Sequence, residues 1–441
     1  MPMGSYASLT LSDYEISQSK SFINTFWSCF FSEDDKRSRM VNFDHYYTEP
    51  ITNDNQVPTY EYAASAETMK LRLEIMGYTL DKVKCEYQNG IDNAIRRRKE
   101  YDYELLAFPT SDEEHLLALK DGGFQYWVGL IRYLFDNGIT IYNENLAKED
   151  AIYRFILEYN DIDEDLYLGY PNIGIGYFLR AALEAVEPSS ELILDITSLV
   201  SSGYYEVDEH VCADTAKAHI DSTLEFQKII ILTEGTTDSE ILSKSLKILY
   251  PKVETYFSFL DFDSYKAEGG SAMLEKTVKS FAAAGINNKI IALFDFDAAG
   301  VAATQRLKKS KLPENIRVTT LPQIDLANSY PTKGPQGTTI ENVNGRACSI
   351  ELYLGVDILT TINNELAAVE WRSMEQQINT YQGEISHKGE LQKNFMRKVS
   401  STIEKGSLDP EHDWSGLRLV FMKVFEVSAS FNHISPNLNS R

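Results

Sequence analysis

The sequence has few cysteines, no long apolar run and no low-complexity stretch. Its four cysteines, Cys29, Cys85, Cys212 and Cys348, lie far apart without a C-x-x-C pair. They indicate neither a disulfide framework nor a zinc site, and a reducing cytoplasm suits them. No apolar run approaches the ~18 residues of a membrane span, and the first residues lack the charged-then-apolar pattern of an export signal. We therefore expect a cytoplasmic protein that has no membrane partner.

Acidic residues are abundant, but they are unevenly distributed. The chain has 441 residues and a net charge of −23, with 43% hydrophobic and 24% charged residues. This composition is ordinary for globular proteins, and the length predicts two or three domains. Residues 1–224 hold 18 Lys and Arg against 39 Asp and Glu, whereas residues 225–441 hold 24 against 26. A polyanion would be repelled by the first half and could be accepted by the second.

The acidic first half mixes helical and extended patterns, so we predict an α+β domain over residues 1–224. The first fifty residues indicate short strands and loops, and residues 192–200 a strand or buried turn. Apolar spacing predicts helices over 66–88 with a break at Gly77, and over 91–103, 114–136, 147–159 and 177–186. The basic run Arg96–Lys99 is typical of a solvated helix face, with a phosphate-contacting patch as the alternative.

From residue 225 to 357 short apolar runs alternate with helical stretches. The predicted strands are 229–233, 255–260, 290–294 and 316–321, and the predicted helices between them are 239–249, 271–284 and 298–309. Such β-α-β units close only as a parallel sheet with right-handed crossovers. We therefore predict a Rossmann-like α/β core here, followed by a helical C-terminal extension over 358–441.

Acidic residues follow two of the predicted strands. Glu234 follows the first strand, with Asp238 four residues later, and Asp295 and Asp297 follow the third. Ligands of open parallel sheets gather at the carboxyl ends of the strands. Residues two apart on an extended segment share a face, so Asp295 and Asp297 can converge on one cation. Such carboxylates repel one another unless a cation neutralises them, and hard oxygen ligands suit Mg²⁺ or Mn²⁺.

These acids could also be purely structural, and similar motifs elsewhere in the chain carry less weight. Single acids at strand ends often serve as turn residues or helix N-caps, but their combination after two strands of one series is harder to explain in that way. A second D-x-D, Asp261 and Asp263, is typical of a loop of secondary importance. The pair Arg39 and His45 fits an R-x₅-H ribonuclease spacing, but we reject it because the segment shows no helical pattern. No P-loop is present, so nucleotide hydrolysis of that type would come from another protein.

The carboxylate pattern resembles the Toprim domain, the metal-binding module of topoisomerases, bacterial primases and the overcoming-lysogenization-defect nucleases. Glu234, Asp295 and Asp297 match its signature, and Asp238 matches the extra acid of the nuclease branch. The stretches IALFDFDAAG, NVNGRACSIELYLG and YQGEISHKGELQKNF, with MGSYASL and LDITSLVSSGYYEVD nearer the N-terminus, resemble a stand-alone bacterial family with a HEPN/Toprim-associated N-terminal region. By this resemblance, Glu351 is a further metal ligand, and Lys388 stabilises the phosphorane or the leaving oxygen.

The resemblance implies a Mg²⁺- or Mn²⁺-dependent nuclease of phage-defence or toxin type, acting on DNA or RNA. Catalysis would depend on Glu234, Asp295 and Lys388, and the metal ligands would be Glu234, Asp238, Asp295, Asp297 and Glu351. The alternative is a regulatory protein whose Toprim site grips a phosphate or nucleotide without cleavage. In the alternative the acidic half docks a protein partner. In the nuclease it either faces away and docks a partner, which could be a second copy of the chain or a separate ATPase of a defence system, or lies across the active-site groove and competes with substrate. We favour the first arrangement, because an occluding domain would need a basic groove and residues 225–441 are only near neutral.

Overall fold

The computed structural model describes residues 4–12, 14–42, 56–101, 110–140, 151–158, 166–220, 228–260, 269–361 and 363–431. By its contacts the chain divides into two units, Met1–Ser222 and Thr223–Arg441, which are described separately below. Among the described helices, none combines the length and the apolar character that crossing a membrane requires. The motif residues Asp261, Asp263 and His45 lie outside the described residues.

The first unit is built on a five-stranded sheet in the order β2-β1-β7-β4-β3, in which all neighbours are antiparallel. Its strands are β1 (Tyr6–Leu11), β2 (Tyr14–Lys20), β3 (Lys36–Asn42), β4 (Gln56–Ser65) and β7 (Glu191–Asp195), and β5 (Leu166–Tyr167) and β6 (Tyr170–Pro171) form a separate small ladder. The strand alternative for residues 192–200 is thus confirmed for its first part.

The helices predicted between residues 66 and 186 are present with shifted bounds, whereas three further helices of the first unit, at residues 25–28, 197–201 and 211–220, were not predicted. The helices of this unit are α1 (Thr25–Ser28), α2 (Ala66–Met76), α3 (Leu80–Tyr101), α4 (Thr110–Asn137), α5 (Ala151–Glu158), α6 (Ile175–Ala182), α7 (Thr197–Ser201) and α8 (Val211–Ile220), with short 3₁₀ turns η1 (Glu33–Asp35) and η4 (Leu183–Ala185). Gly77 ends α2 in the left-handed conformation, with φ of 95°, which glycine adopts without strain. Of the basic run, Arg96 and Arg97 are exposed, as expected for a solvated helix face, whereas the guanidinium of Arg98 is partly buried and lies 5.8 Å from the centroid of the Phe155 ring.

An aromatic cluster holds the helices of the first unit together. The indole of Trp127 on α4 is fully buried, and its Nε1 donates a hydrogen bond of 2.9 Å to the carbonyl of Leu168. Three further rings contact this indole at centroid distances of 5.2–6.2 Å, namely Tyr87 on α3, Tyr170 on β6 and Phe178 on α6. Because each large ring buries ~150–250 Å², this cluster contributes a major share of the unit's core.

In the second unit the predicted parallel sheet is present, with strand order β12-β10-β8-β9 and all pairs parallel. The strands are β8 (Ile229–Leu232), β9 (Phe257–Phe259), β10 (Ile290–Phe294) and β12 (Ile316–Thr320), and the helices that follow the first three are α9 (Thr236–Leu249), α10 (Ser271–Ala283) and α11 (Ala298–Lys309), with the 3₁₀ turn η6 (Pro251–Tyr256) before β9. All five residues of β10 are buried, as expected for a strand covered on both faces.

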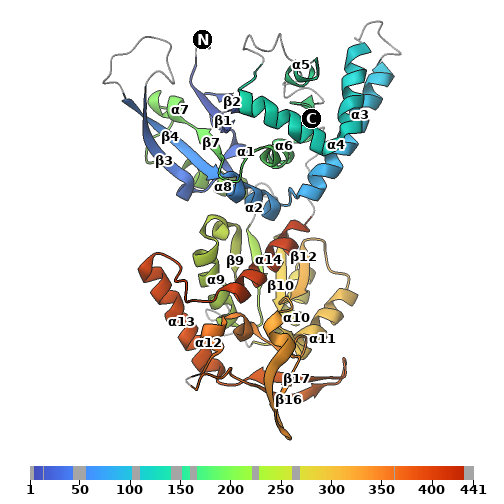
Figure 1. Ribbon diagram of the computed structural model, residues 1–441, viewed down its shortest axis with the longest axis vertical. Helices are drawn as coiled ribbons and strands as arrows, with labels where there is room; N and C mark the ends of the chain where they lie inside the picture. Colours follow the sequence, from blue (N-terminus) through green and yellow to red (C-terminus); the bar gives the residue numbers. More distant parts are fainter. Residues whose placement is uncertain are drawn as a thin grey trace. The chain divides into compact units, whose positions relative to one another are not determined.

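Helices cover both faces of this sheet (Figure 1). On one face Leu274 of α10 and Leu307 of α11 pack against Ile290 and Phe294. On the other face lie α9 and α14 (Ser415–Ala429), where the rings of Phe257 and Phe425 are 5.7 Å apart. The second unit is therefore a three-layer α/β structure in which a helix from the last part of the chain forms part of the core.

Residues 358–441, which we predicted as a mainly helical extension, contain two long helices but also two strands that were not predicted. This segment contains the hairpin β16 (Val369–Glu375) and β17 (Thr380–Ile385), which joins β13 (Tyr330–Gly334) and β14 (Gly337–Glu341) in a sheet of order β14-β13-β16-β17. The remaining elements of the second unit are β11 (Phe296–Asp297), η8 (Asp325–Ser329), β15 (Ala347–Cys348), η9 (Ile350–Tyr353), α12 (Val356–Leu359) and α13 (Lys388–Lys405). Strand β16 alternates little, with three exposed side chains in succession, two polar and one a methionine, so its sequence gives no clear strand signal.

Candidate functional site at the carboxyl edge of the parallel sheet

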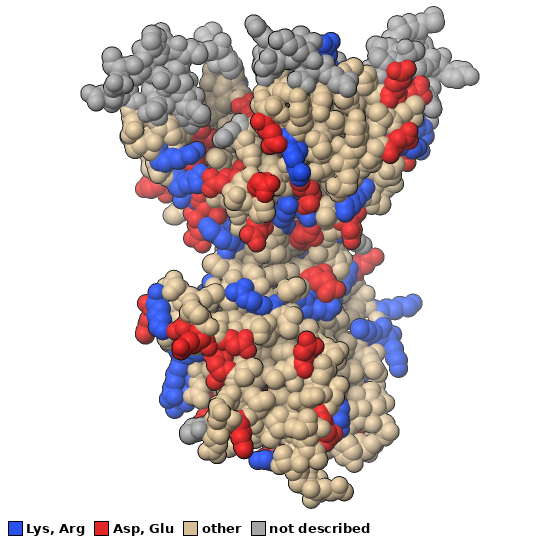
Figure 2. Space-filling view, viewed as in Figure 1, with Lys and Arg blue, Asp and Glu red and all other residues tan. Residues whose placement is uncertain are grey.

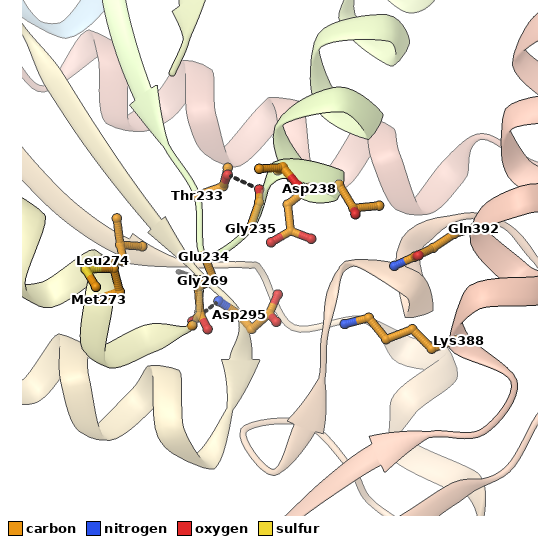
Figure 3. A pocket seen from close by; sticks show the side chains of 13 residues that line it. Thr233, Glu234, Gly235, Asp238, Gly269, Met273, Leu274, Asp295, Lys388 and Gln392 are labelled. Carbon is orange, nitrogen blue, oxygen red and sulfur yellow. Dashed lines mark hydrogen bonds between the residues drawn. The ribbon is translucent and has the colours of Figure 1, made fainter. Parts of the chain in front are cut away.

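Three acids and one lysine surround a cavity of about 330 Å³ at the carboxyl ends of β8 and β10 (Figure 3). Glu234 follows β8, Asp238 lies in the first turn of α9, and Asp295 follows β10. Lys388, the first residue of α13, extends toward these carboxylates from the opposite side of the cavity. The parallel sheet thus brings together side chains that are up to 154 positions apart in the chain.

Glu234 is held by the backbone of two neighbouring segments. The amide of Asp295 donates a hydrogen bond of 3.0 Å to Oε1 of Glu234, and the amide of Gly270 donates one of 2.7 Å to its carbonyl oxygen. A Cβ atom at Gly269 would lie 2.9 Å from the same carbonyl, which is closer than van der Waals contact allows. Glycine is therefore required where this loop passes the end of β8.

The acids of the cavity are in an environment that opposes their ionisation. Burial, with the nearby charges of Asp297 and Asp238, raises the pKa of Glu234 to about 8. Burial and the charge of Glu351 raise the pKa of Asp238 to about 6, although Lys388 acts in the opposite direction. The pKa of Asp295 lies well above its ordinary value because of burial and the four neighbouring acids. Carboxylates so placed require a proton or a cation nearby.

Asp297 makes different contacts from Asp295. It is the N-cap of α11, where its Oδ1 accepts a hydrogen bond of 2.7 Å from the amide of Gly300. Its Oδ2 accepts a hydrogen bond from the side chain of Gln382 on β17. Asp297 is not among the residues that line the cavity. Its carboxylate is close enough to raise the pKa of Glu234, but both of its oxygens already have protein donors.

Glu351 and Lys388, which the sequence places 37 residues apart, meet at the site. Glu351 is fully buried on η9, and its Oε1 lies 3.3 Å from Nζ of Lys388. The same oxygen accepts a hydrogen bond of 2.7 Å from Gln392, and Oε2 accepts one of 2.5 Å from Ser349. Burial lowers the pKa of Lys388, but the charges of Glu351, Asp295 and Asp238 outweigh burial and keep it above its ordinary value. Lys388 is therefore a permanent cation beside the acids.

The donor chemistry of the site fits a hard divalent cation. Glu234, Asp238 and Asp295 offer carboxylate oxygens to one cavity, and burial together with the neighbouring negative charges raises their pKa values. A bound cation would offset both effects. In the part of the chain that the structure describes, no three His, Cys, Asp or Glu side chains are arranged to hold a metal ion together. Side-chain rotation would be needed for these three acids to share one ion.

Two glutamines at the site have no counterpart among the residues that the sequence predicted. Gln392 lies one helical turn after Lys388 and lines the cavity beside it (Figure 3). Gln382 accepts a hydrogen bond of 3.0 Å from the amide of Ala299 while it donates to Asp297. The spacing of four residues from Lys388 could have indicated Gln392, since such residues share a helix face. Gln382 lies on a strand that we predicted as helix, so its position could not be foreseen.

Gly300 permits the close approach of α11 to the site. A Cβ at this position would lie 2.2 Å from the carbonyl oxygen of Asp295, so alanine must displace the backbone that carries this acid. We expect Gly300→Ala to reduce the free energy of unfolding of the second unit by about 1–3 kcal/mol, as measured by urea denaturation. The control is Gly129→Ala in α4, where a Cβ meets nothing within 4 Å and alanine should be neutral or stabilising. Equal effects of both variants would contradict the packing argument.

Comparison with known families gives a match for the first half of the chain. Residues 3–219 match the family model described as HEPN/Toprim N-terminal domain 1, which supports the relation to the HEPN/Toprim-associated family that the sequence motifs indicate. The matched residues lie in the acidic half and do not include the carboxylate cavity. No curated protein and no solved structure matches the chain.

Proposed function

We propose that this chain is a divalent-metal-dependent nuclease with a Toprim-type site in its second unit. The observation that carries the proposal is the convergence of Glu234, Asp238 and Asp295 with Lys388 on one cavity at the carboxyl edge of a parallel sheet. The match of the N-terminal half to a HEPN/Toprim domain supports the same class. From the family resemblance, we place the enzyme among phage-defence or toxin effectors.

Each residue has a role that follows from its surroundings. Glu234, Asp238 and Asp295 would hold Mg²⁺ or Mn²⁺, with Glu351 and Asp297 as supporting acids, and the metal would supply Lewis-acid activation of water and of the phosphodiester. Lys388 places a positive charge 3.3 Å from Glu351 and beside the cavity, where negative charge develops on the phosphoryl oxygens. Gln382 and Gln392 hold Asp297 and Glu351 in place by hydrogen bonds.

Cleavage can be tested directly. Purified protein would be incubated with plasmid DNA and with total RNA, in Mg²⁺ or Mn²⁺ and with or without a chelator. We expect strand breaks in the DNA, in the RNA or in both, and we expect them only when the metal ion is present. Intact DNA and RNA under all conditions would contradict the nuclease assignment.

One observation favours the alternative function, a site that grips phosphate without cleaving it. Within the described ranges no three acids are arranged to share a metal, and Lys388 is already paired with Glu351. A protein of this kind would bind a nucleotide or nucleic-acid end with unchanged strand length. The same incubation, followed by a filter-binding measurement, separates binding alone from cleavage.

Lys388 should matter for the reaction rather than for metal affinity. We expect Lys388→Ala to lower kcat by roughly 10²–10³-fold, the loss typical of removing one group that stabilises transition-state charge. Lys388→Arg keeps the charge and should retain part of the rate. The control is Lys393→Ala, an exposed lysine on the same helix. If Lys388→Ala leaves both kcat and the metal dependence unchanged, Lys388 has no role in the reaction and serves only as the ion-pair partner of Glu351.

A further inference from the structure

A basic groove lies on α10 in the second unit, outside the carboxylate cavity. Lys276 and Lys279 line a shallow groove of about 480 Å³ along this helix. Glu275 bridges α10 to α11, because its Oε1 lies 2.6 Å from Nζ of Lys279 and its Oε2 lies 2.8 Å from Nε of Arg306. One carboxylate thus fixes two cations, and the groove keeps an excess of positive charge.

The basic surface continues beyond Arg306 along α11. Lys308 and Lys309 end this helix, Lys311 follows it, and all three are exposed. Among the described residues, neither these three lysines nor Lys276 forms an ion pair. Figure 2 shows Lys and Arg side chains that project from the side of this unit where Figure 1 draws α11. Interaction with the helix dipole explains basic residues in a last turn, but it does not explain Lys276 in mid-helix or Lys311 outside the helix.

Both helices lead away from the candidate site. Helix α10 follows Gly269 and Gly270, which line the cavity, and α11 follows Asp297 directly. At ~1.5 Å per residue, Lys276 lies about 8 Å along α10 and Lys309 about 17 Å along α11. A duplex carries one phosphate charge per ~1.7 Å of its axis, so such a surface is long enough for several backbone phosphates.

We propose that the strip formed by Lys276, Lys279, Arg306, Lys308, Lys309 and Lys311 binds the phosphate backbone of a nucleic acid whose strand enters the carboxylate site. This inference rests on the proposed nuclease function and adds the path of the substrate. The lysines contact phosphates only, so recognition is independent of base sequence. An acidic protein can accept a polyanion here, because the strip places four lysines that have no ion-pair partner among the described residues on the unit that bears the site.

The test compares two fourfold variants of the full-length chain. The first replaces the unpaired lysines by glutamine, at positions Lys276, Lys308, Lys309 and Lys311. The control replaces four lysines of the same unit that each pair with a carboxylate, Lys244, Lys247, Lys405 and Lys423. Both variants lose four positive charges, so they differ only in where on the second unit these charges are removed. The probes are a 20-base-pair DNA duplex and a 20-base-pair RNA duplex.

Binding is measured at several salt concentrations in an Asp295→Asn background, and cleavage is measured in the active background. For the bound polymer, the strip variant should raise Kd about tenfold or more and reduce the slope of log K against log salt by about two to four. In cleavage it should raise KM with little change in kcat. The control variant should stay within about twofold of the parent protein in Kd and in KM.

The two proposals fail in different ways. Equal Kd values and equal salt slopes for the strip and control variants, with cleavage intact, would overturn the strip and leave the nuclease standing. Binding that depends on the strip, without cleavage by the parent protein, would support the strip and overturn the nuclease function. Absence of both binding and cleavage would overturn both.

Discussion

Asp295→Asn should abolish cleavage, with a loss of at least about 10³-fold in kcat/KM. The side chain keeps its shape but no longer offers a negative oxygen to a cation in the cavity. Because Asp295 is partly buried and lies near four other acids, removal of its charge should cost no stability in the presence of a chelator. The melting temperature without metal is therefore expected to be equal to that of the unmodified protein or higher. Glu234→Gln should behave in the same way.

The matched control for these variants is Glu240→Gln on α9. Glu240 is two residues from Asp238 but exposed, and its carboxylate pairs with Lys244 on the surface. This change should leave the rate within about twofold, because exposed ion pairs contribute little. Cleavage rates measured for Asp295→Asn, Glu234→Gln and Glu240→Gln test whether the acids of the cavity are needed for the reaction. Full activity in Asp295→Asn would show that the cavity is not where cleavage occurs.

Arg72→Met should destabilise the first unit by about 3–5 kcal/mol, the usual cost of leaving one partner of a buried ion pair alone. Both Arg72 and Asp35 have fully buried side chains, and Nη1 of Arg72 lies 2.6 Å from Oδ2 of Asp35. The same nitrogen donates to the carbonyl of Phe30 at 3.0 Å. One side chain of α2 thus connects to the segment that precedes β3, and its loss leaves a buried negative charge.

Calorimetry of three variants tests this prediction. Lys120→Met breaks the exposed pair with Asp92 and should cost less than about 1 kcal/mol. The double variant Arg72→Met with Asp35→Leu removes both buried charges, so it should recover part of the loss. Since the chain has two units, the shift is expected in one unfolding transition while the other stays in place. A loss of under 1 kcal/mol in Arg72→Met would contradict the ion-pair argument.

The sequence was most informative where burial is complete. Strand β10 and helix α11 occur at the predicted residues, because a short apolar run with five buried side chains and a capped amphipathic helix leave little ambiguity. The hairpin of β16 and β17 was missed because exposed polar residues such as Arg372 interrupt its alternation. Its pairing with β13 is a tertiary interaction, which overrides local preference.

The residue types of the site could be predicted from the sequence, but the contacts that each side chain makes could not. Position at strand ends was enough to expect Glu234 and Asp295 side by side. Spacing alone suggested that Asp297 shares the function of Asp295, whereas its contacts with Gly300 and Gln382 make it a helix cap. The ion pair between Lys388 and Glu351 could not be derived from residue patterns, because it depends on how α13 packs against η9. The ligand roles of all five acids stay predictions.

The packing of α14 on the parallel sheet has a consequence for the order of folding during synthesis. Domains commonly fold as units while the chain emerges from the ribosome, and the first unit is complete by residue 222. In the second unit, one face of the sheet is covered by α9 without α14 until residues 415–429 are available. Lys388 reaches the acids only from α13, which also comes late in the chain. A nascent chain would therefore carry a folded acidic unit and an unassembled carboxylate site, so the proposed nuclease would not be competent during most of translation.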